Sequence, residues 1–225
     1  MAVSTTFEAL LVHHAGVAFE KQIFLGGLIG ERNWAYSLSS GKITFGNDLS
    51  YNMQLLGTEV SASQMWQWAW ANTGSRIPPQ LLGAANTIKA YGERNSVPAL
   101  FTADVTLSVG TSGHYIAMVA SGLYKARAYY RIPFKESALY VLIDDPAYPA
   151  DPRHPAQRIA ETFPQLIQSV PFTDHRAMFT GYLEAYNMLT RTDETTIRGI
   201  YPEDRRQVIA QFDAAGRMLA INTSL

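Results

Sequence analysis

The segment MWQWAWA, from Met65 to Ala71, places a tryptophan at every second position. Successive side chains of an extended strand point to opposite faces of a sheet, so this alternation predicts a strand. One face would carry Trp66, Trp68 and Trp70, and the other face the residues between them. Each indole can bury about 200 Å². The row therefore either fills the space between a sheet and its helices, or stays partly open as an aromatic wall for a small molecule.

Strand-like runs precede this segment at residues 34–38, 42–45 and 51–58, with Ser40-Gly41 as a hairpin turn. Connections this short force antiparallel neighbours, because a parallel crossover needs about a dozen residues or more. Two later runs, ARAYYRIPF (126–134) and ALYVLID (138–144), also fit strands. The second is apolar throughout, which predicts a central strand that is covered on both faces.

Apolar residues at helical spacing predict helices over residues 5–25, 78–94 and 112–123. Gly26-Gly27 is expected to end the first helix, Pro78-Pro79 to open the second, and Ser112 to cap the third. The fold prediction is therefore α+β. An antiparallel sheet from residues 34–71 and 126–143 would carry the three helices.

A proline-rich stretch, DDPAYPADPRHP (144–155), is the predicted domain boundary. Proline fixes its own backbone and disfavours helix at the preceding residue, so this stretch should form a stiff, extended connector. We expect a main domain over residues 1–145, a connector over 146–155, and a small α+β unit over 156–225 that docks on the main domain. The small unit should hold helices over 156–170, with a break near Pro164, and over 174–189. A three-stranded meander would follow, made of TTIRGIY (195–201), QVIAQFD (207–213) and RMLAIN (217–222), with Gly216 in a left-handed turn position.

Composition argues against several classes of protein. The 225 residues include 19 acidic and 18 basic side chains, and no basic run is longer than Arg205-Arg206, which argues against nucleic-acid binding. The absence of cysteine excludes disulfides, thiolate catalysis and iron–sulfur clusters. The N-terminal apolar run is interrupted by His13-His14, so it fits neither a signal peptide nor a membrane span. A cytoplasmic location without a membrane partner is expected.

Few residues suggest chemistry. Arg131 follows Tyr129 by two positions, so the two side chains should share a strand face. A guanidinium held against aromatic rings can bind an anion, or it can be one partner of a buried salt bridge. The five histidines show neither His-x-x-x-His nor Glu-x-x-His spacing, so no metal site is expected. Asp144 and Asp145 could form an acid/base pair, although an aspartate before proline is also common turn chemistry.

Two longer segments, LLGTEVSASQMWQWAWAN (55–72) and GLYKARAYYRIPFKESALYVLI (122–143), resemble a family of uncharacterised bacterial cytoplasmic proteins, one of the domain-of-unknown-function families. In that family a Leu-Gly-Thr turn leads into a Trp-x-Trp-Ala-Trp-Ala-Asn strand, and an Ala-Tyr-Tyr-Arg-x-Pro segment follows. These motifs lie here at residues 56–58, 66–72 and 128–133. The resemblance covers roughly residues 30–145 and implies no activity, no catalytic residue and no cofactor.

Three functional hypotheses follow. The first is a non-enzymatic protein that binds a small organic ligand on a tryptophan-lined sheet face, through Trp66, Trp68, Trp70, Tyr129 and Arg131. The second is a protein-interaction module, of a toxin-neutralising or secretion-accessory type, whose C-terminal unit supplies the contact surface. The third is a hydrolase that combines Asp144 or Asp145 with a histidine and Arg131. No assembled catalytic motif is present, which favours a binding protein over an enzyme.

Overall fold

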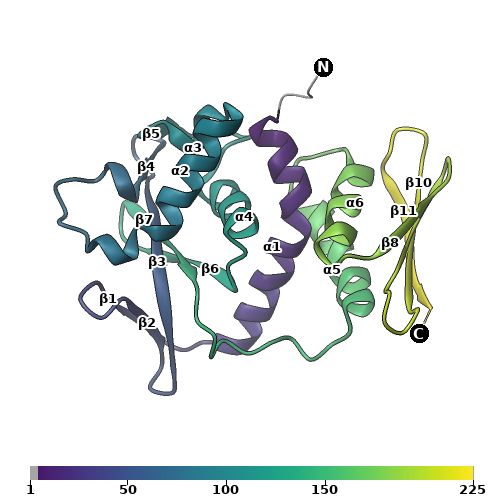
Figure 1. Cartoon of the computed structure of the whole chain (residues 1–225), viewed down its shortest axis with the longest axis horizontal. Coiled ribbons are helices and arrows are strands. Elements are labelled where there is room, and N and C mark those ends of the chain that lie inside the picture. Colours follow the sequence, from purple (N-terminus) through teal and green to yellow (C-terminus); the bar gives the residue numbers. More distant parts are fainter. Residues whose placement is uncertain (1–4, 225) are drawn as a thin grey trace. The chain divides into compact units, whose positions relative to one another are not determined.

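The computed structural model describes residues 5–224. Residues 1–4, at the start of the predicted first domain, and Leu225, at the end of the predicted C-terminal unit, lie outside this range. The chain divides into two units: residues up to Glu8 together with Lys21–Ala150 form unit 1, and Ala9–Glu20 together with Asp151–Leu225 form unit 2. Helices accompany one seven-stranded and one four-stranded antiparallel sheet (Figure 1), which confirms the α+β class.

The sheet of unit 1 is built around one long strand. β3 pairs with β2, β4 and β7, while β1 pairs with β2, β5 with β4, and β6 with β7. β7 thus lies between β3 and β6, and its residues from Tyr140 to Ile143 are buried, as its apolar sequence predicts. The seven strands are β1 Trp34–Ser37, β2 Lys42–Phe45, β3 Leu49–Val60, β4 Met65–Trp68, β5 Asp104–Thr106, β6 Ala128–Pro133 and β7 Ser137–Ile143.

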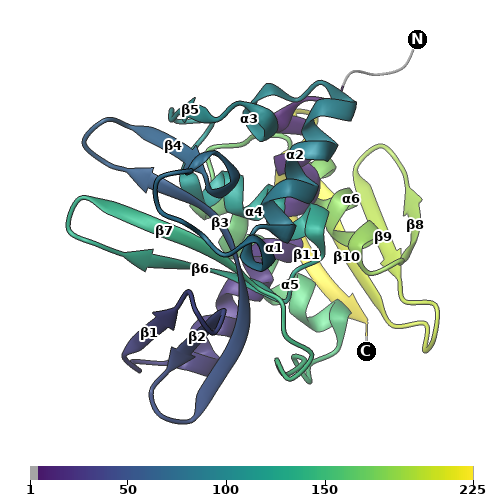
Figure 2. The same cartoon turned by 60° about the vertical axis from the view of Figure 1, so that its left-hand side comes forward.

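Helices cover one face of this sheet. α2 (Gly83–Asn95) and α4 (Gly113–Tyr124) both contact β3, and α4 also contacts β6 and β7 (Figure 2). A short helix, α3 (Pro98–Phe101), follows α2. α4 begins where the sequence predicts, because the Ser112 Oγ accepts a hydrogen bond of 3.2 Å from the backbone N–H of Tyr115.

Two helix ends differ from expectation. α1 (Phe7–Ile29) runs through Gly26 and Gly27, and it ends at Gly30, whose φ of +53° is the left-handed conformation that commonly follows a helix. Pro79–Leu81 forms a 3₁₀ turn, η2, and α2 begins only at Gly83. Both differences have one cause: a glycine or proline pair marks a region where a helix can end or begin, and tertiary contacts decide at which residue it does so.

Unit 2 contains α5 (Pro155–Ser169), α6 (His175–Ala185) and a sheet with the strand order β11-β10-β9-β8. The three predicted strands are β9 (Thr196–Ile200), β10 (Gln207–Phe212) and β11 (Met218–Ser224), and Gly216 has the expected left-handed φ of +78°. The sequence analysis missed β8 (Leu189–Thr192), because this strand is short, polar in its second half and fully exposed.

α5 continues through Pro164 without the predicted break. A proline inside a helix removes one backbone hydrogen bond. In α5 the side chains of Ile159, Phe163 and Leu166 are completely buried, so packing offsets that loss. Among residues 5–224, no helix combines the length and the apolar character that crossing a bilayer requires.

α1 takes part in both units, because its residues 9–20 belong to unit 2. Gly181 of α6 lies directly against the backbone of His13, where an added Cβ would be 2.5 Å from the His13 carbonyl oxygen. The sequence-based boundary near residue 150 therefore describes only one of the connections between the units. The predicted first domain included the whole of this helix, whereas the division into compact units groups residues 9–20 with residues 151–225.

Candidate functional site

The tryptophan row is shorter than predicted. β4 ends at Trp68, and Ala69–Ala71 forms a 3₁₀ turn, so Trp70 leaves the alternating pattern. Trp66 and Trp68 do share a face, but both are 0% exposed. Their rings meet edge to face at 5.4 Å, and the Trp68 Nε1 donates to the Ala99 carbonyl at 3.1 Å. These two indoles are core residues and form no open wall.

The close packing beneath these indoles requires a glycine. Gly57 pairs with Trp68 across β3 and β4, and a Cβ at Gly57 would lie 2.4 Å from the Trp66 ring. Trp70 has a different environment. It is half-buried, and the Lys89 ammonium lies 4.3 Å from its ring centroid, which is a cation–π contact.

Tyr129 and Arg131 lie on the same sheet face as Trp66, with β3 and β7 between their strand and β4. Tyr140 connects them: it pairs with Arg131 across β6 and β7, and its ring lies 5.3 Å from that of Trp66. The Tyr140 hydroxyl donates a hydrogen bond of 2.8 Å to the Glu59 carboxylate. The structure thus brings together four of the five predicted residues, although only Arg131 among these four retains solvent exposure beyond a few per cent.

His114 completes this group, which we call the Tyr140 cluster (Glu59, His114, Tyr129, Arg131 and Tyr140). The His114 Nδ1 lies 3.3 Å from the Tyr129 hydroxyl oxygen, and its ring packs 5.4 Å from that of Tyr140. The residue is exposed, but this packing removes water from the ring and, together with the charge of Arg131, lowers the pKa of His114. Burial raises the pKa of Tyr129 and of Tyr140, so both hydroxyls stay protonated.

Internal contacts close the Tyr140 cluster. A Cβ on Gly113 would collide with the Glu59 carboxylate and with the Tyr140 ring, so the start of α4 already occupies the space above them. Glu59 and Tyr140 were missed by sequence reasoning. Only the pairing register of β3, β6 and β7 reveals them, since neither residue belongs to a recognisable motif.

The carboxylates of Asp144 and Asp145 accept hydrogen bonds from a tyrosine hydroxyl and from backbone N–H groups, respectively. The Asp145 carboxylate accepts N–H bonds from Asn52 at 2.7 Å and from Ala147 at 2.8 Å, and Asp144 accepts the Tyr124 hydroxyl at 3.2 Å. Within residues 5–224 neither aspartate has a hydrogen bond or an ion pair with a histidine, so the acid/base constellation of the hydrolase hypothesis is not assembled there. The same residues contain no group of three or more histidine or carboxylate ligands that could hold a metal ion.

A pocket of about 190 Å³ opens on the opposite face of the unit 1 sheet. We call it the Phe134 pocket. Tyr36 from β1 and Phe134 from the β6–β7 turn form its aromatic walls, with ring centroids 6.4 Å apart and nearly perpendicular planes. Its other lining residues are aliphatic or neutral polar: Leu38, Leu55, Thr58, Gln67, Ala69, Asn72, Ser75, Ile77, Ser137 and Leu139.

A β-bulge shapes the floor of this pocket. Leu55 pairs with Val141 and Gly57 pairs with Tyr140, which leaves Leu56 as the extra residue on β3. Leu55 and Thr58 therefore face the same side, together with Gln67 of β4 and Leu139 of β7. Gln67 is the residue between Trp66 and Trp68 on β4. Thr58 of β3 pairs with Gln67, and Leu139 of β7 pairs with Thr58. The tryptophan motif thus lies on a strand that lines this pocket, but Trp66 and Trp68 face the other side of the sheet.

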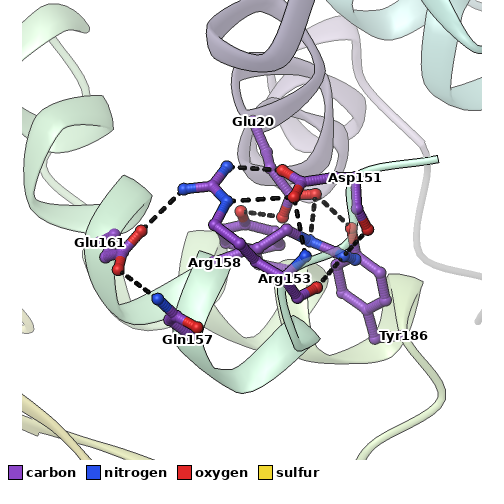
Figure 3. A network of polar contacts seen from close by, with 8 residues as sticks. Glu20, Asp151, Arg153, Gln157, Arg158, Glu161 and Tyr186 are labelled. Atoms are coloured by element: carbon purple, nitrogen blue, oxygen red, sulfur yellow. Dashed lines mark hydrogen bonds and ion pairs between the residues drawn. The ribbon is translucent and has the colours of Figure 1, made fainter. Parts of the chain in front are cut away.

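Unit 2 holds a buried ionic group of a different kind (Figure 3), which we call the Glu20 network. Glu20 is 4% exposed, and its carboxylate accepts hydrogen bonds of 2.5 Å from the hydroxyls of Tyr182 and Tyr186. The Arg158 Nε lies 3.0 Å from the same carboxylate. Burial and the Glu20 charge raise the pKa of both tyrosines, so they remain donors.

The outer part of the Glu20 network satisfies Arg158 and Arg153. The Arg158 Nη1 donates to the backbone carbonyls of Asp151 and Arg153, while the Arg153 guanidinium bridges the carboxylates of Asp151 and Glu161. Every charge in the network has a counter-charge within it (Figure 3). This arrangement ties α1 at Glu20 to α5 through Arg158 and to α6 and the residue after it through Tyr182 and Tyr186.

Together these features define a two-unit α+β protein that has a neutral surface pocket on one sheet and, among residues 5–224, no group of three or more histidine or carboxylate side chains that could hold a metal ion. Residues 8–146 match the model of DUF6882, a family of unknown function, and the chain belongs to this family. No curated protein and no solved structure gives a significant match. The family match includes the α1 residues of unit 2 but none of residues 151–225.

Proposed function

We propose that this protein is a non-enzymatic binding protein for a small organic molecule, with the Phe134 pocket as its site. The observation that supports this proposal is the pocket itself, about 190 Å³ of space between aromatic and aliphatic walls. Small-molecule sites are typically concave and mostly apolar, with a few polar groups that orient the ligand. In this proposal Trp66, Trp68, Tyr129 and Arg131 support the sheet from its other face and do not contact the ligand.

The test of this proposal is a ligand screen with a pocket-filling variant. A metabolite library would be scanned by thermal shift against the wild-type protein and against Ser137→Phe, which places a ring in the pocket from a half-buried position. Trp34 is a built-in reporter, since its ring lies 6.5 Å from Tyr36 and 6.2 Å from Phe134. We expect hits that stabilise the wild type, change Trp34 emission and have no effect on Ser137→Phe.

Trp68→Ala is the matched control for the tryptophan-wall hypothesis. Because Trp68 is completely buried, its truncation should lower stability by about 3–5 kcal/mol while the remaining folded protein still binds the hits. If binding were lost in folded Trp68→Ala and kept in Ser137→Phe, the ligand site would lie on the tryptophan face. If no compound in the library loses its binding when Ser137 is replaced by phenylalanine, the proposal that the Phe134 pocket is the ligand site is refuted.

A second candidate function is protein interaction through unit 2, and one observation favours it. Arg191 of β8 pairs directly with Arg198 of β9. Both side chains are exposed, and neither has an ion pair or hydrogen bond within residues 5–224. Like charges in direct cross-strand positions destabilise a sheet. An acidic segment of a partner protein would remove this repulsion.

The two arginines lie on the uncovered face of the four-stranded sheet. Gly199 faces α6, where an added Cβ would be 2.4 Å from Leu183, so its neighbour Arg198 points to the other side. A fluorescein-labelled hexaglutamate peptide is a suitable probe for this face. Binding that weakens with salt and disappears in Arg191→Ser/Arg198→Ser would support the second candidate, and equal binding by the double variant would contradict it.

A further inference from the structure

We propose that the Phe134 pocket selects an uncharged ligand with a single ring and one or two hydrogen-bonding groups, and rejects carboxylate or ammonium analogues of the same size. This inference rests on the proposed binding function and adds the chemical class of the ligand. Three properties of the pocket carry it: its size, its aromatic walls and its lack of charge.

The size of the pocket limits the ligand to about one ring. An engineered cavity of about 150 Å³ with an apolar lining is known to bind benzene. The 190 Å³ of the Phe134 pocket therefore accommodates a six-membered ring with one or two small substituents. A fused polycyclic ligand would have to displace Phe134, which is 45% exposed and forms one wall.

The walls favour a flat ring. Tyr36 and Phe134 stand at 77° to each other, and Trp34 packs against both from outside the lining. Aromatic pairs prefer offset or edge-to-face arrangements with centroids about 4.5–7 Å apart. A ring inserted between these walls can meet one face and one edge, while Leu55 and Leu139 supply the floor.

The polar part of the lining can serve a neutral ligand. Thr58, Ser137 and Tyr36 carry hydroxyls that make no hydrogen bond within residues 5–224, so these hydroxyls are available as donors and acceptors. Gln67 is already engaged through its Nε2, which donates to Asp104 at 3.1 Å. A hydroxyl, carbonyl or amide on the ligand matches this set.

The lining contains no residue that is charged near neutral pH. Four charged residues directly adjoin lining positions in the sequence: Glu59, Arg76, Lys135 and Glu136. Arg76, Lys135 and Glu136 are exposed residues outside the lining, and the Glu59 carboxylate lies on the other face of the sheet, where it accepts the Tyr140 hydroxyl. A ligand ion would lose part of its hydration without gaining a counter-charge, which is unfavourable by several kcal/mol when burial is complete. For this partly open pocket we expect at least a tenfold loss of affinity.

The experiment compares benzyl alcohol, benzoate and benzylammonium, which share one ring and nearly one size. Dissociation constants would be measured by ligand-observed NMR with the full chain near neutral pH. We expect benzyl alcohol to bind in the millimolar range, as is usual for a ligand of so few atoms. Benzoate and benzylammonium should each bind at least about tenfold more weakly, and Ser137→Phe should abolish binding of the alcohol.

A charge placed in the pocket should change this selectivity. Ser137→Asp should improve benzylammonium binding and weaken benzoate binding further, whereas Ser137→Lys should do the opposite. Ser50→Asp is the matched control, since Ser50 is an exposed residue of β3 outside the lining and its substitution should leave all three affinities unchanged.

The possible failures separate the two proposals. If benzoate or benzylammonium binds as tightly as benzyl alcohol and Ser137→Phe blocks it, the neutral class is wrong and the binding function stands. If none of the three compounds binds, but a larger library compound binds the wild type and not Ser137→Phe, the single-ring limit is wrong. If no compound shows that sensitivity, both the function and its ligand class are refuted.

Discussion

At the residue scale, two carboxylates show how burial and partners decide what an acidic side chain does. Glu20 is enclosed by Arg158 and two tyrosine hydroxyls, while Asp145 is held by backbone N–H groups. Both carboxylates are buried, and burial of an acidic side chain is also typical of catalytic and ligand-binding sites. Their partners are all internal, which makes them structural, and each leads to a measurable prediction.

Glu20→Ala should destabilise the protein by about 3–5 kcal/mol, because it leaves the Arg158 guanidinium buried without its counter-charge. Glu20→Gln should be less harmful, since the amide oxygen still accepts one tyrosine hydroxyl. Urea unfolding at neutral pH measures both effects. Glu184→Ala is the control: this carboxylate is 55% exposed beside His13, and its loss should change stability by less than about 0.5 kcal/mol. Equal effects of Glu20→Ala and Glu184→Ala would contradict this role.

Asp145 should make stability depend on pH in the acid range. The N–H of Asn52, and then that of Ala147, hold the pKa of Asp145 below its ordinary value. A carboxyl group with a depressed folded-state pKa stabilises the fold above its unfolded pKa of about 4, and this contribution is lost as the pH falls through the folded value. Asp145→Asn should therefore lower the melting temperature at pH 7, and the gap to wild type should narrow towards pH 2. A gap that stays constant with pH would refute the assignment.

At the element scale, glycines decide how closely helices and strands approach. Gly181 of α6 touches the backbone of His13, Gly199 of β9 accommodates Leu183, and Gly57 of β3 lies under Trp66. None of these three has a positive φ. They are required by the space around them and not by their own backbone conformation.

Gly181→Ala should destabilise the protein by about 1–3 kcal/mol, because its Cβ would lie 2.5 Å from the His13 carbonyl oxygen and the helices would have to separate. Gly26→Ala is the matched control within a helix. No atom lies within 4 Å of its Cβ position, so the higher helix propensity of alanine should stabilise by about 0.5–1 kcal/mol. Thermal unfolding of the two variants should therefore shift in opposite directions, and shifts of the same sign would contradict the packing argument.

At the scale of the whole molecule, the division into units does not follow the chain. Residues 9–20 lie in the sequence between the two segments of unit 1, residues up to Glu8 and residues 21–150. They nevertheless belong with residues 151–225 in unit 2. Leu10, Leu11, Ala15 and Ala18 in this segment are all buried. The C-terminal region is thus not an independent appendage, since part of its core comes from the N-terminal helix.

Deletion of residues 151–225 should expose that apolar stripe of α1. We expect the fragment 1–150 to self-associate in size-exclusion chromatography and to lose hydrogen-exchange protection over residues 9–20. The fragment 21–150 is the control, because it lacks the stripe and should elute as a smaller, less associated species. A monomeric fragment 1–150 with native protection over residues 9–20 would show that the stripe needs no partner from unit 2.

Local chemistry in the sequence determined the α+β class and most of the elements. Strand-like runs located nine of the eleven strands within residues 5–224, missing β5 and β8, the Ser112 cap located the start of α4, and Gly41 and Gly216 located two turns, because each of these signals depends only on neighbouring residues. The resemblance to a family of unknown function is confirmed by the family match over residues 8–146.

Only the tertiary structure decided which sheet face is covered and which residues meet. Alternation separates the two faces of β4 but does not say which one the helices bury, and the bulge at Leu56 sets which β3 residues join the Phe134 pocket. The pairs Glu20–Arg158 and Glu59–Tyr140 are far apart in the chain and carry no spacing signal. Strand register and helix packing create these contacts, and both result from the minimum of free energy of the whole chain and not from any single segment of it.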